Sequence, residues 1–415
     1  MRAHYEGPIG RAAPSSTDAP GDRMLFLDLW FWTFAAIAVP VYLVCPQRLK
    51  LYWVLAASAV FHYHFAGPAG MAPIIVLGVL TYFAALSPRR LGGWSMAGLV
   101  ILLLVLALTF YKYSRFLIDN GLTLLGAVGA DAPGALLTWQ SPIAPLGISF
   151  FTFEFVHYLY EVRVHGRPPI RNPFHFAVFS IFFPTLAAGP IKRFPDFVPQ
   201  LATLANPSVE RWFAGLRRVI LGLFKKVCIA DLLVQYIQVF ERAEVFTAPL
   251  VILLAMLQGW RIYYDFAGYT DMAVGLAQML NLTVPENFNR PYGSTSLQEF
   301  WRRWHMSLST WIRDYVYIPL GGNRARRAVN LTLAMVICGL WHGADWHFAA
   351  WGLFHGLALA IESGVRRVYP ALFAERWPQR LFGWLVCYSV VSYGWLLFFY
   401  PLGTVAKLTR ALLVW

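Results

Sequence analysis

The sequence predicts an all-α, polytopic integral membrane protein of about 10–12 transmembrane helices, some of them re-entrant or interfacial. Of its 415 residues, 58% are hydrophobic and only 13% are charged, and the mean hydropathy is +0.53. Soluble domains contain about 45–50% apolar residues, so this excess indicates a membrane protein. Apolar windows of about 20 residues, long enough to cross roughly 30 Å of hydrocarbon, recur along most of the chain.

The apolar windows predict one membrane domain over residues 23–415, preceded by a polar, disordered tail over residues 1–22. The first apolar run continues to Val44, which favours an uncleaved first span over a cleaved signal peptide. The windows lie near residues 24–44, 50–66, 71–86, 95–113, 142–160, 174–190, 213–239, 248–280, 329–341, 344–361 and 381–399.

The net charge of +13 is distributed along the chain in short clusters between apolar runs. This pattern is typical of cytoplasmic loops that follow the positive-inside rule, not of one basic face. We therefore expect membrane lipids as partners and no nucleic acid. The clusters are Arg48 with Lys50, Arg89 with Arg90, Lys192 with Arg193, Arg324 to Arg327, and Arg366 with Arg367.

An apolar span near residue 150 carries ionisable side chains. In "PLGISFFTFEFVHYLYEV", Glu154, His157 and Glu161 have the spacing of one helix face. The segment "FFPTLAAGPIKRFPDFVPQL" follows, rich in proline and glycine, with the basic pair Lys192 and Arg193. Non-helical backbone at membrane depth requires surrounding protein or a water-filled cavity, so this break suggests a cavity.

Two carboxylates, Asp265 and Asp271, lie in the apolar segment "GWRIYYDFAGYTDMAVGLAQMLNL". A carboxylate inside a membrane is costly and rare, which makes it a candidate for function. The alternative is a structural ion pair with an arginine of a neighbouring helix. The sequence leaves both interpretations open.

The segment "PENFNRPYGSTSLQEFWRRWHMSLSTWIRDYVYIPLGGNR" predicts a single amphipathic helix. Ser296 and Glu299 have capping-box spacing, so the helix should begin at Leu297. Its charges favour a position at the membrane interface or in a cavity. One face would carry Phe300, Trp304, Trp311 and Tyr315, another would carry Arg302, Ser309 and Arg313, and His305 would lie close to Trp301, Leu308 and Ile312.

The stretch "GLWHGADWHFAAWG" places polar residues between two apolar helical runs. Gly343 is predicted to adopt the left-handed conformation that ends a helix, which puts His342 at a helix break. Asp345 is a good N-cap for the following helix. On that helix His347, Trp351 and His355 share a face, where packing is the expected role of both histidines.

Three chemistries could use these polar groups. A metal site is not predicted, because the sequence has neither an H-E-x-x-H motif nor a Cys/His cluster. A proton-coupled transporter would use the buried acids and histidines as a relay. An acyl-transfer enzyme would use a histidine as general base, since its ordinary pKa of about 6.5 suits proton removal from a hydroxyl at neutral pH. The residues alone do not decide between these last two.

The segments quoted above over residues 285–324 and 339–352 together resemble the membrane-bound O-acyltransferases. Within this family they are similar to the bacterial proteins of alginate O-acetylation and teichoic-acid D-alanylation. "PLGISFFTFEFVHYLYEV", "FFPTLAAGPIKRF" and "YYDFAGYTDMAVGL" match as well, so the resemblance covers a core at about residues 142–361. The chain ends at Trp415, nearer the length of the D-alanylating type, whereas "PLGGNR" and "GLWHGADW" read more like the acetylating type.

The resemblance implies a bundle with funnels from both membrane faces that meet near a catalytic histidine. The family's essential histidine falls on His342, as general base, and its upstream histidine on His305, which would orient the donor or stabilise the oxyanion. Further candidates for the funnel or for support of the histidines are Trp341, Trp304, Asp265, Asp271, Glu299, Arg302, Arg303, Arg313 and Asn289.

The implied reaction moves a small acyl group, acetyl before others, from an activated donor to a hydroxyl of a cell-envelope polysaccharide. Acetyl-CoA or an acyl carrier protein would supply the thioester as co-substrate, with no permanently bound cofactor and no metal. A periplasmic or extracytoplasmic acyltransferase is the expected protein partner, and the bacterial inner membrane the expected location. D-alanyl transfer to teichoic acid and a non-catalytic subunit that passes acyl groups on remain alternatives.

Overall fold

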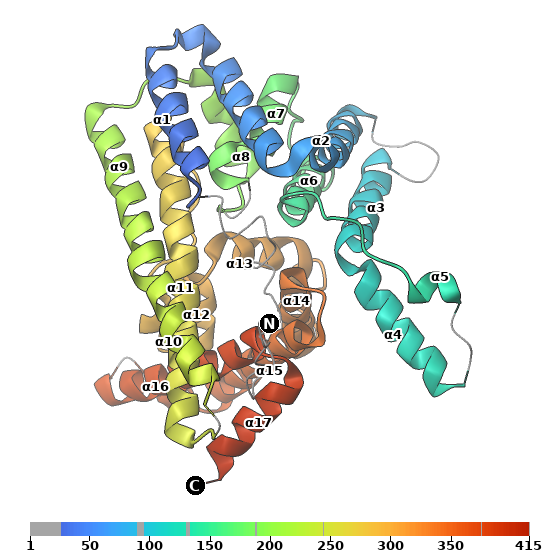
Figure 1. The fold of residues 1–415 in the computed structure, drawn as a ribbon, viewed down its shortest axis with the longest axis vertical. Helices are drawn as coiled ribbons and strands as arrows, with labels where there is room; N and C mark the ends of the chain where they lie inside the picture. The colour runs from blue at the N-terminus through green and yellow to red at the C-terminus, as the bar shows by residue number, and fades with distance from the viewer. Residues whose placement is uncertain are drawn as a thin grey trace, which may run out of the picture. The chain divides into compact units, whose positions relative to one another are not determined.

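The structure is a computed structural model that describes residues 26–88, 95–129, 133–186, 189–243, 245–374 and 376–414. Within these ranges every regular element is a helix (Figure 1), which confirms the all-α prediction. The predicted polar tail over residues 1–22 lies outside the described residues, as does the basic pair Arg89 and Arg90.

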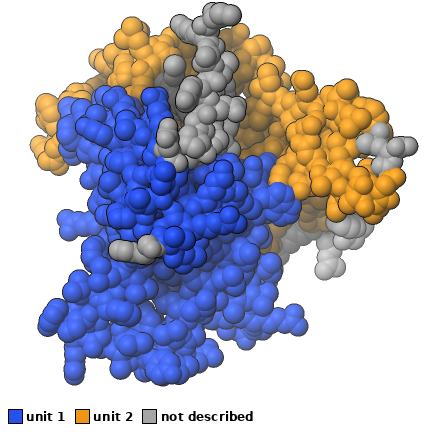
Figure 2. Space-filling model, turned by 60° about the horizontal axis from the view of Figure 1, so that its bottom comes forward, with its two compact units in different colours: residues 1–19, 218–272, 286–415 blue, residues 20–217, 273–285 orange. Residues whose placement is uncertain are grey.

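The chain divides into two compact units, coloured separately in Figure 2. Unit 1 comprises residues 1–19, 218–272 and 286–415, and unit 2 comprises residues 20–217 and 273–285. Two of the divisions fall within helices, α9 (Val209–Leu223) and α11 (Ala248–Met279), and the one between residues 285 and 286 follows α11. The single membrane domain expected over residues 23–415 stays a prediction.

Unit 2 contains the N-terminal helices. Their bounds are α1 Leu29–Val44, α2 Lys50–Leu86, α3 Met96–Leu108, α4 Ser114–Ala127, α5 Gly134–Leu137, α6 Ile148–Arg163, α7 Pro173–Ile181 and α8 Phe194–Phe197. Helix α2 is kinked where Gly67 adopts a φ of 62°, a conformation that glycine reaches without steric cost, directly before Pro68.

The ionisable face predicted for residues 154–161 lies on α6 and is buried. The Lys192 ammonium binds the Glu154 carboxylate at 2.7 Å, and both side chains are almost fully buried. The backbone N–H of Phe194 donates to His157 Nε2 at 3.0 Å. The segment rich in proline and glycine therefore binds Glu154 and His157 through Lys192 and its own backbone, whereas Glu161 pairs with His165 and Arg167.

Unit 1 contains the C-terminal helices. Apart from its parts of α9 and α11, they are α10 Asp231–Glu241, α12 Leu297–Arg303, α13 Met306–Ile312, α14 Arg327–His342, α15 Trp346–Val368, α16 Trp377–Phe399 and α17 Leu402–Leu413. Helices α14 and α15 form the tightest helix pair of this unit: a short turn joins them, and they pack antiparallel along glycines.

In the part of the chain that the structure describes, four helical segments are long and apolar enough to cross a membrane. They are Gln47–Leu86, Met96–Ala127, Trp346–Val368 and Trp377–Phe399, and Leu29–Val44 and Pro173–Thr185 are shorter apolar helices. This number is lower than the predicted 10–12, because several apolar windows fold as shorter helices. Helices α6 and α14 have 16 residues each, about 24 Å at 1.5 Å per residue.

Candidate active site

The predicted amphipathic helix begins where the capping box placed it. Ser296 Oγ accepts from the backbone N–H of Glu299 at 3.2 Å, and α12 starts at Leu297. The Glu299 carboxylate accepts from the Thr295 N–H at 2.8 Å instead of from the N–H of the cap residue itself. A second carboxylate, that of Glu362 on α15, accepts from the N–H groups of Leu297 and Gln298.

The expected single helix over residues 297–315 is wrong. Helix α12 ends at Arg303, and α13 begins only at Met306. Between them His305 has a φ of 41° and a ψ of 54°, the left-handed conformation that residues with a Cβ rarely adopt. Trp304 consequently lies in the break after α12, whereas Trp311 lies on α13, and the two do not form one continuous aromatic face.

The imidazole of His305 is buried among aromatic rings of unit 1. The ring of Phe266 on α11 meets it edge to face at 4.5 Å between centroids, and the indole of Trp341 lies at 6.0 Å. Among the described residues, His305 Nε2 has no hydrogen-bond partner, although it is buried. Burial, with the neighbouring His342 second, holds the pKa of His305 well below its usual range.

His342 is the last residue of α14, in agreement with the predicted helix break. Gly343, however, is extended, with a φ of −166°, so the left-handed conformation predicted for it is wrong. Glycine is required there for space: a Cβ at Gly343 would lie 2.0 Å from the ring of Phe348. Asp345 caps α15 as expected, since its Oδ1 accepts from the His347 N–H at 3.1 Å.

Close packing of α14 against α15 sets the position of His342. A Cβ on Gly339 would lie 2.2 Å from Phe348 O, and one on Gly352 would lie 2.3 Å from Met335 O. Small residues of this kind let helix backbones approach closely in membrane proteins.

The rings of both histidines lie near one indole, that of Trp341. Trp341 contacts the His342 ring at 4.9 Å between centroids and the His305 ring at 6.0 Å. Further aromatic rings surround His342, with Phe398 at 5.0 Å and Trp351 at 5.4 Å. The imidazoles of His305 and His342, each at a break between helices, thus share an aromatic environment. Both can carry a proton, and the surrounding rings limit the access of water to them.

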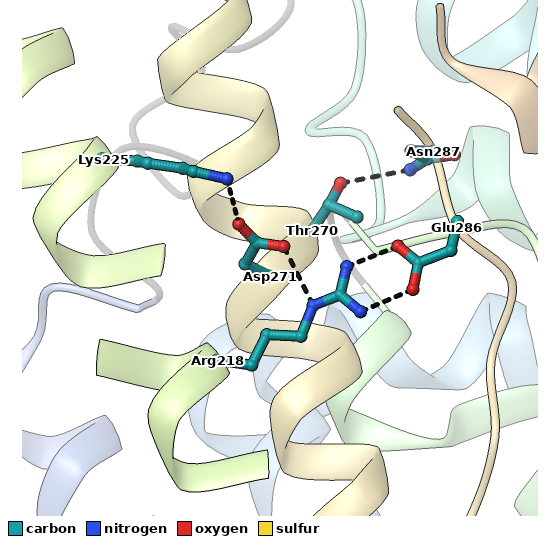
Figure 3. Close-up of polar contacts among 6 residues, drawn as sticks. All are labelled: Arg218, Lys225, Thr270, Asp271, Glu286 and Asn287. Carbon is teal, nitrogen blue, oxygen red and sulfur yellow. Dashed lines mark hydrogen bonds and ion pairs between the residues drawn. The ribbon is translucent and has the colours of Figure 1, made fainter. Parts of the chain in front are cut away.

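The intramembrane carboxylates form ion pairs. Asp271 accepts from Arg218 Nε at 2.9 Å and also binds the Lys225 ammonium, and Arg218 binds Glu286 with its two terminal nitrogens (Figure 3). Asp265 binds Lys226 at 2.6 Å. Asp271 thus has the arginine partner of the structural alternative, and Asp265 has a lysine in its place; a functional role for either carboxylate stays a prediction.

The remaining candidates surround α12 and α13. Arg303 binds Glu299 at 2.6 Å. Burial raises the pKa of Glu299, but the Thr295 hydrogen bonds and the nearby arginines outweigh this effect and lower it. Arg302 is exposed, and so is Arg313, whose guanidinium binds Asp314 at 2.7 Å.

Trp304 directly precedes His305, and the backbone of Asn289 binds the chain at Arg303. Trp304 is buried and packs on Phe300 and Trp395, at 5.5 Å and 4.8 Å between ring centroids. The side chain of Asn289 is exposed, but its backbone N–H donates to Arg303 O at 3.0 Å. Asn289 therefore acts through its backbone, which the sequence does not reveal.

The predicted face of His347, Trp351 and His355 is buried on α15. Nδ1 of His347 contacts Leu397 O at 3.1 Å, and His355 packs against Trp351 at 5.0 Å between ring centroids. These contacts agree with the packing role expected for both histidines.

Sequence reasoning missed five polar residues that organise this region: Arg218, Lys225, Glu286, Asn287 and Glu362. A signal existed for the first two, because Arg218 and Lys225 are seven residues apart and so share a face of an apolar helix. No pattern marked Glu286, Asn287 or Glu362, whose partners lie far away in the sequence.

Comparison with known proteins agrees with this architecture. A model of the MBOAT, membrane-bound O-acyltransferase family matches residues 155–401, more than half of the chain. A probable alginate O-acetylase AlgI of Azotobacter vinelandii is 35% identical over 381 residues, which cover 89% of this chain and 74% of the relative.

Two other relatives carry different names. A peptidoglycan O-acetyltransferase of Helicobacter pylori is 32% identical over 397 residues, covering 85% of this chain and 71% of the relative. A teichoic acid D-alanyltransferase of Bacillus subtilis is 31% identical over 274 residues, covering 62% of this chain and 69% of the relative. The chain therefore belongs to the membrane-bound O-acyltransferase family and is a membrane acyltransferase.

Proposed function

We propose that this acyltransferase moves an acetyl group from an acyl thioester to a hydroxyl of a cell-envelope polysaccharide, with His342 and His305 as its catalytic residues. The observation that carries the proposal is the pair of imidazoles at two chain breaks, both near the indole of Trp341. Acyl transfer to a hydroxyl needs a group that removes its proton and a group that stabilises the oxyanion.

His342 acts as the general base. Its imidazole takes the proton of the acceptor hydroxyl while the hydroxyl oxygen attacks the thioester carbonyl, forming a tetrahedral oxyanion. Collapse of this intermediate breaks the carbon–sulfur bond, and the imidazolium returns the proton to the leaving thiolate. The products are an ester and a free thiol, and His342 ends as it began.

His305 acts on the donor. Because its pKa is lowered, the ring is neutral at pH 7 and carries one N–H. With the proton on Nε2, this buried nitrogen donates to the developing oxyanion, for which it has no competing partner among the described residues. The rings of Trp341, Trp351 and Phe398 restrict water and so limit hydrolysis of the thioester.

The donor is acetyl-CoA or an acetylated acyl carrier protein, a co-substrate that leaves after each turnover. Both present the acyl group on a phosphopantetheine arm, and the exposed guanidinium groups of Arg302 and Arg313 are suited to its phosphate. Arg303 is paired with Glu299 and Arg313 with Asp314, so a phosphate would compete with a carboxylate at both, but not with these carboxylates at Arg302.

The names of the relatives favour acetyl transfer over D-alanyl transfer. The relatives named as O-acetylating match 85% and 89% of this chain, whereas the D-alanyltransferase matches 62%. We place the protein in the bacterial inner membrane, where the donor comes from the cytoplasm. An extracytoplasmic acyltransferase is the partner expected to complete transfer to the glycan.

The test uses the whole protein in lipid nanodiscs, with radiolabelled acetyl-CoA, acetylated carrier protein and D-alanylated carrier protein as separate donors. His342→Ala is expected to abolish transfer, and His305→Ala to reduce it severely. His64→Ala is the matched control, since His64 is exposed in unit 2 and stacks on Trp30. Full transfer by His342→Ala at normal expression would show that His342 is not the base.

The acceptor is identified in cells. Mass analysis of envelope glycans from cells with and without the protein should find acetyl esters that depend on His342. D-alanyl esters in their place would contradict acetyl transfer. If glycan acylation requires the protein but neither histidine, the result would support the alternative that the protein is a non-catalytic subunit that passes acyl groups on.

A further inference from the structure

The backbone at His305 requires an external constraint. A left-handed conformation is unfavourable for a residue with a Cβ, so it persists only where the surrounding structure enforces it. Neither α12 nor α13 supplies the constraint alone, since the chain leaves one helix before His305 and enters the next after it.

A second segment, residues 287–289, runs beside the break and binds it on both sides. The N–H of Asn289 donates to Arg303 O at 3.0 Å, and the N–H of Met306 donates to Asn287 O at 2.9 Å. The side chain of Asn287 adds two bonds, because its Oδ1 accepts from Ser307 Oγ at 2.6 Å and from the Ser307 N–H at 3.3 Å.

Asn287 is itself anchored to α11. Its side chain is fully buried, and Nδ2 donates to Thr270 Oγ1 at 3.2 Å. One residue earlier, Glu286 is held by the guanidinium of Arg218, which also binds Asp271, the residue after Thr270 (Figure 3). The segment that binds both sides of the His305 break is therefore held at two consecutive residues, at Glu286 by Arg218 and at Asn287 by Thr270.

The same helix also contacts the imidazole. Phe266, whose ring packs edge to face on His305, lies one helical turn before Thr270 on α11. Helix α11 thus acts on the ring of His305 through Phe266 and on its backbone through Thr270 and Asn287.

From this geometry we propose that Asn287 is a positioning residue, whose amide bridges Thr270 and Ser307 and holds His305 in the orientation that acyl transfer requires. The predicted effect on catalysis rests on the proposed function of His305, whereas the predicted effect on the conformation of His305 does not. Asn287 does not touch donor or acceptor, so its loss should act on kcat and leave the donor KM unchanged.

The test compares three variants of the full chain in nanodiscs. Asn287→Leu keeps the branch at Cγ and removes every side-chain hydrogen bond. Asn287→Asp keeps the acceptor for Ser307, and the Thr270 hydroxyl can donate to it. Asn330→Leu is the matched control: Asn330 is equally buried and donates to Gly322 O and Ala325 O at the opposite end of α14 from His342.

Two readouts are measured. A misplaced catalytic group costs about 100-fold in rate per ångström, so Asn287→Leu should lower kcat about 10- to 100-fold, with donor KM within about twofold of the wild type. Asn287→Asp should recover most of this loss, and Asn330→Leu should stay within about twofold. Diethyl pyrocarbonate labelling, followed by peptide mass spectrometry, should modify His305 faster in Asn287→Leu than in the other two proteins.

The outcomes separate the proposals. If His305 is still protected from labelling in Asn287→Leu, and if the kcat of this variant equals that of Asn330→Leu, Asn287 does not position His305. If Asn287→Leu does not fold, Thr270→Val and Ser307→Ala carry the same comparison, each removing one hydroxyl of the bridge. If labelling rises while His305→Ala keeps full activity, Asn287 positions His305 but the proposed role of His305 is wrong.

Discussion

Replacing Gly339 by alanine tests how the helix pair α14–α15 positions His342. The added Cβ would lie 2.2 Å from Phe348 O, whereas real Cβ contacts are at least 3.0 Å. The backbones must therefore separate locally by at least 0.8 Å, because the obstacle is a backbone carbonyl that cannot rotate away as a side chain could. Gly339 lies three residues before His342, so the displacement reaches the imidazole within one turn of α14.

The size of the expected loss of rate in Gly339→Ala follows from this separation of the two backbones. A misplacement of about 1 Å costs about 100-fold in rate, or about 2.7 kcal/mol in the activation free energy. Overpacking itself costs typically about 1–3 kcal/mol in the free energy of unfolding. We therefore expect Gly339→Ala to lower kcat by one to two orders of magnitude and to lower the melting temperature.

The assay measures acetyl transfer at saturating donor and thermal unfolding in the same nanodiscs. Gly364→Ala is the matched control, since Gly364 lies on α15 and a Cβ there meets nothing within 4 Å. It should keep kcat within about twofold and leave stability unchanged or slightly raised. If Gly339→Ala behaves as Gly364→Ala does in both measurements, the helix contact does not position His342.

Three further predictions concern the groups around the site. Glu362→Gln should destabilise the start of α12 by about 0.5–2 kcal/mol, because its carboxylate accepts from the first two N–H groups of that helix, and thermal unfolding measures the loss. Asp271→Asn leaves Arg218 and Lys225 without their shared anion, and should lower the free energy of unfolding by about 1–3 kcal/mol. The pKa of His305 is lowered in the folded chain. As the pH falls below about 6.5, this imidazole therefore takes up a proton in the unfolded chain before it does so in the folded chain. The free energy of unfolding should therefore be highest above this pH and should fall by up to about 1.4 kcal/mol per pH unit below it. His305→Asn should show a smaller decrease of melting temperature between pH 6.5 and 5.

The features that the sequence predicted correctly have short-range causes. A capping box spans four residues, so Ser296 and Glu299 predict the start of α12 without any knowledge of the fold. Asp345 caps α15 for the same reason. The shared face of Glu154, His157 and Glu161 follows from helical periodicity, and the structure buries all three on α6.

The sequence-based errors arise where a long-range contact overrides a local preference. Nothing in "RWHMSL" breaks a helix, yet His305 is left-handed because residues 287–289 bind the chain on both sides of it. Gly343 was assigned to a left-handed turn on local grounds, whereas the reason for glycine is the ring of Phe348, which packs where a Cβ would be.

By itself, the sequence determined the all-helical membrane class and several helix ends. These conclusions depend on composition, on period and on capping motifs, which are properties of neighbouring residues, whereas the two histidines proposed for acyl transfer came from the resemblance to the family. Only the tertiary structure decided that the rings of His305 and His342 both lie near Trp341, and that Asn287 links α11 to the His305 break. Such relations join residues that are distant along the chain, and packing forms them only when the helices assemble.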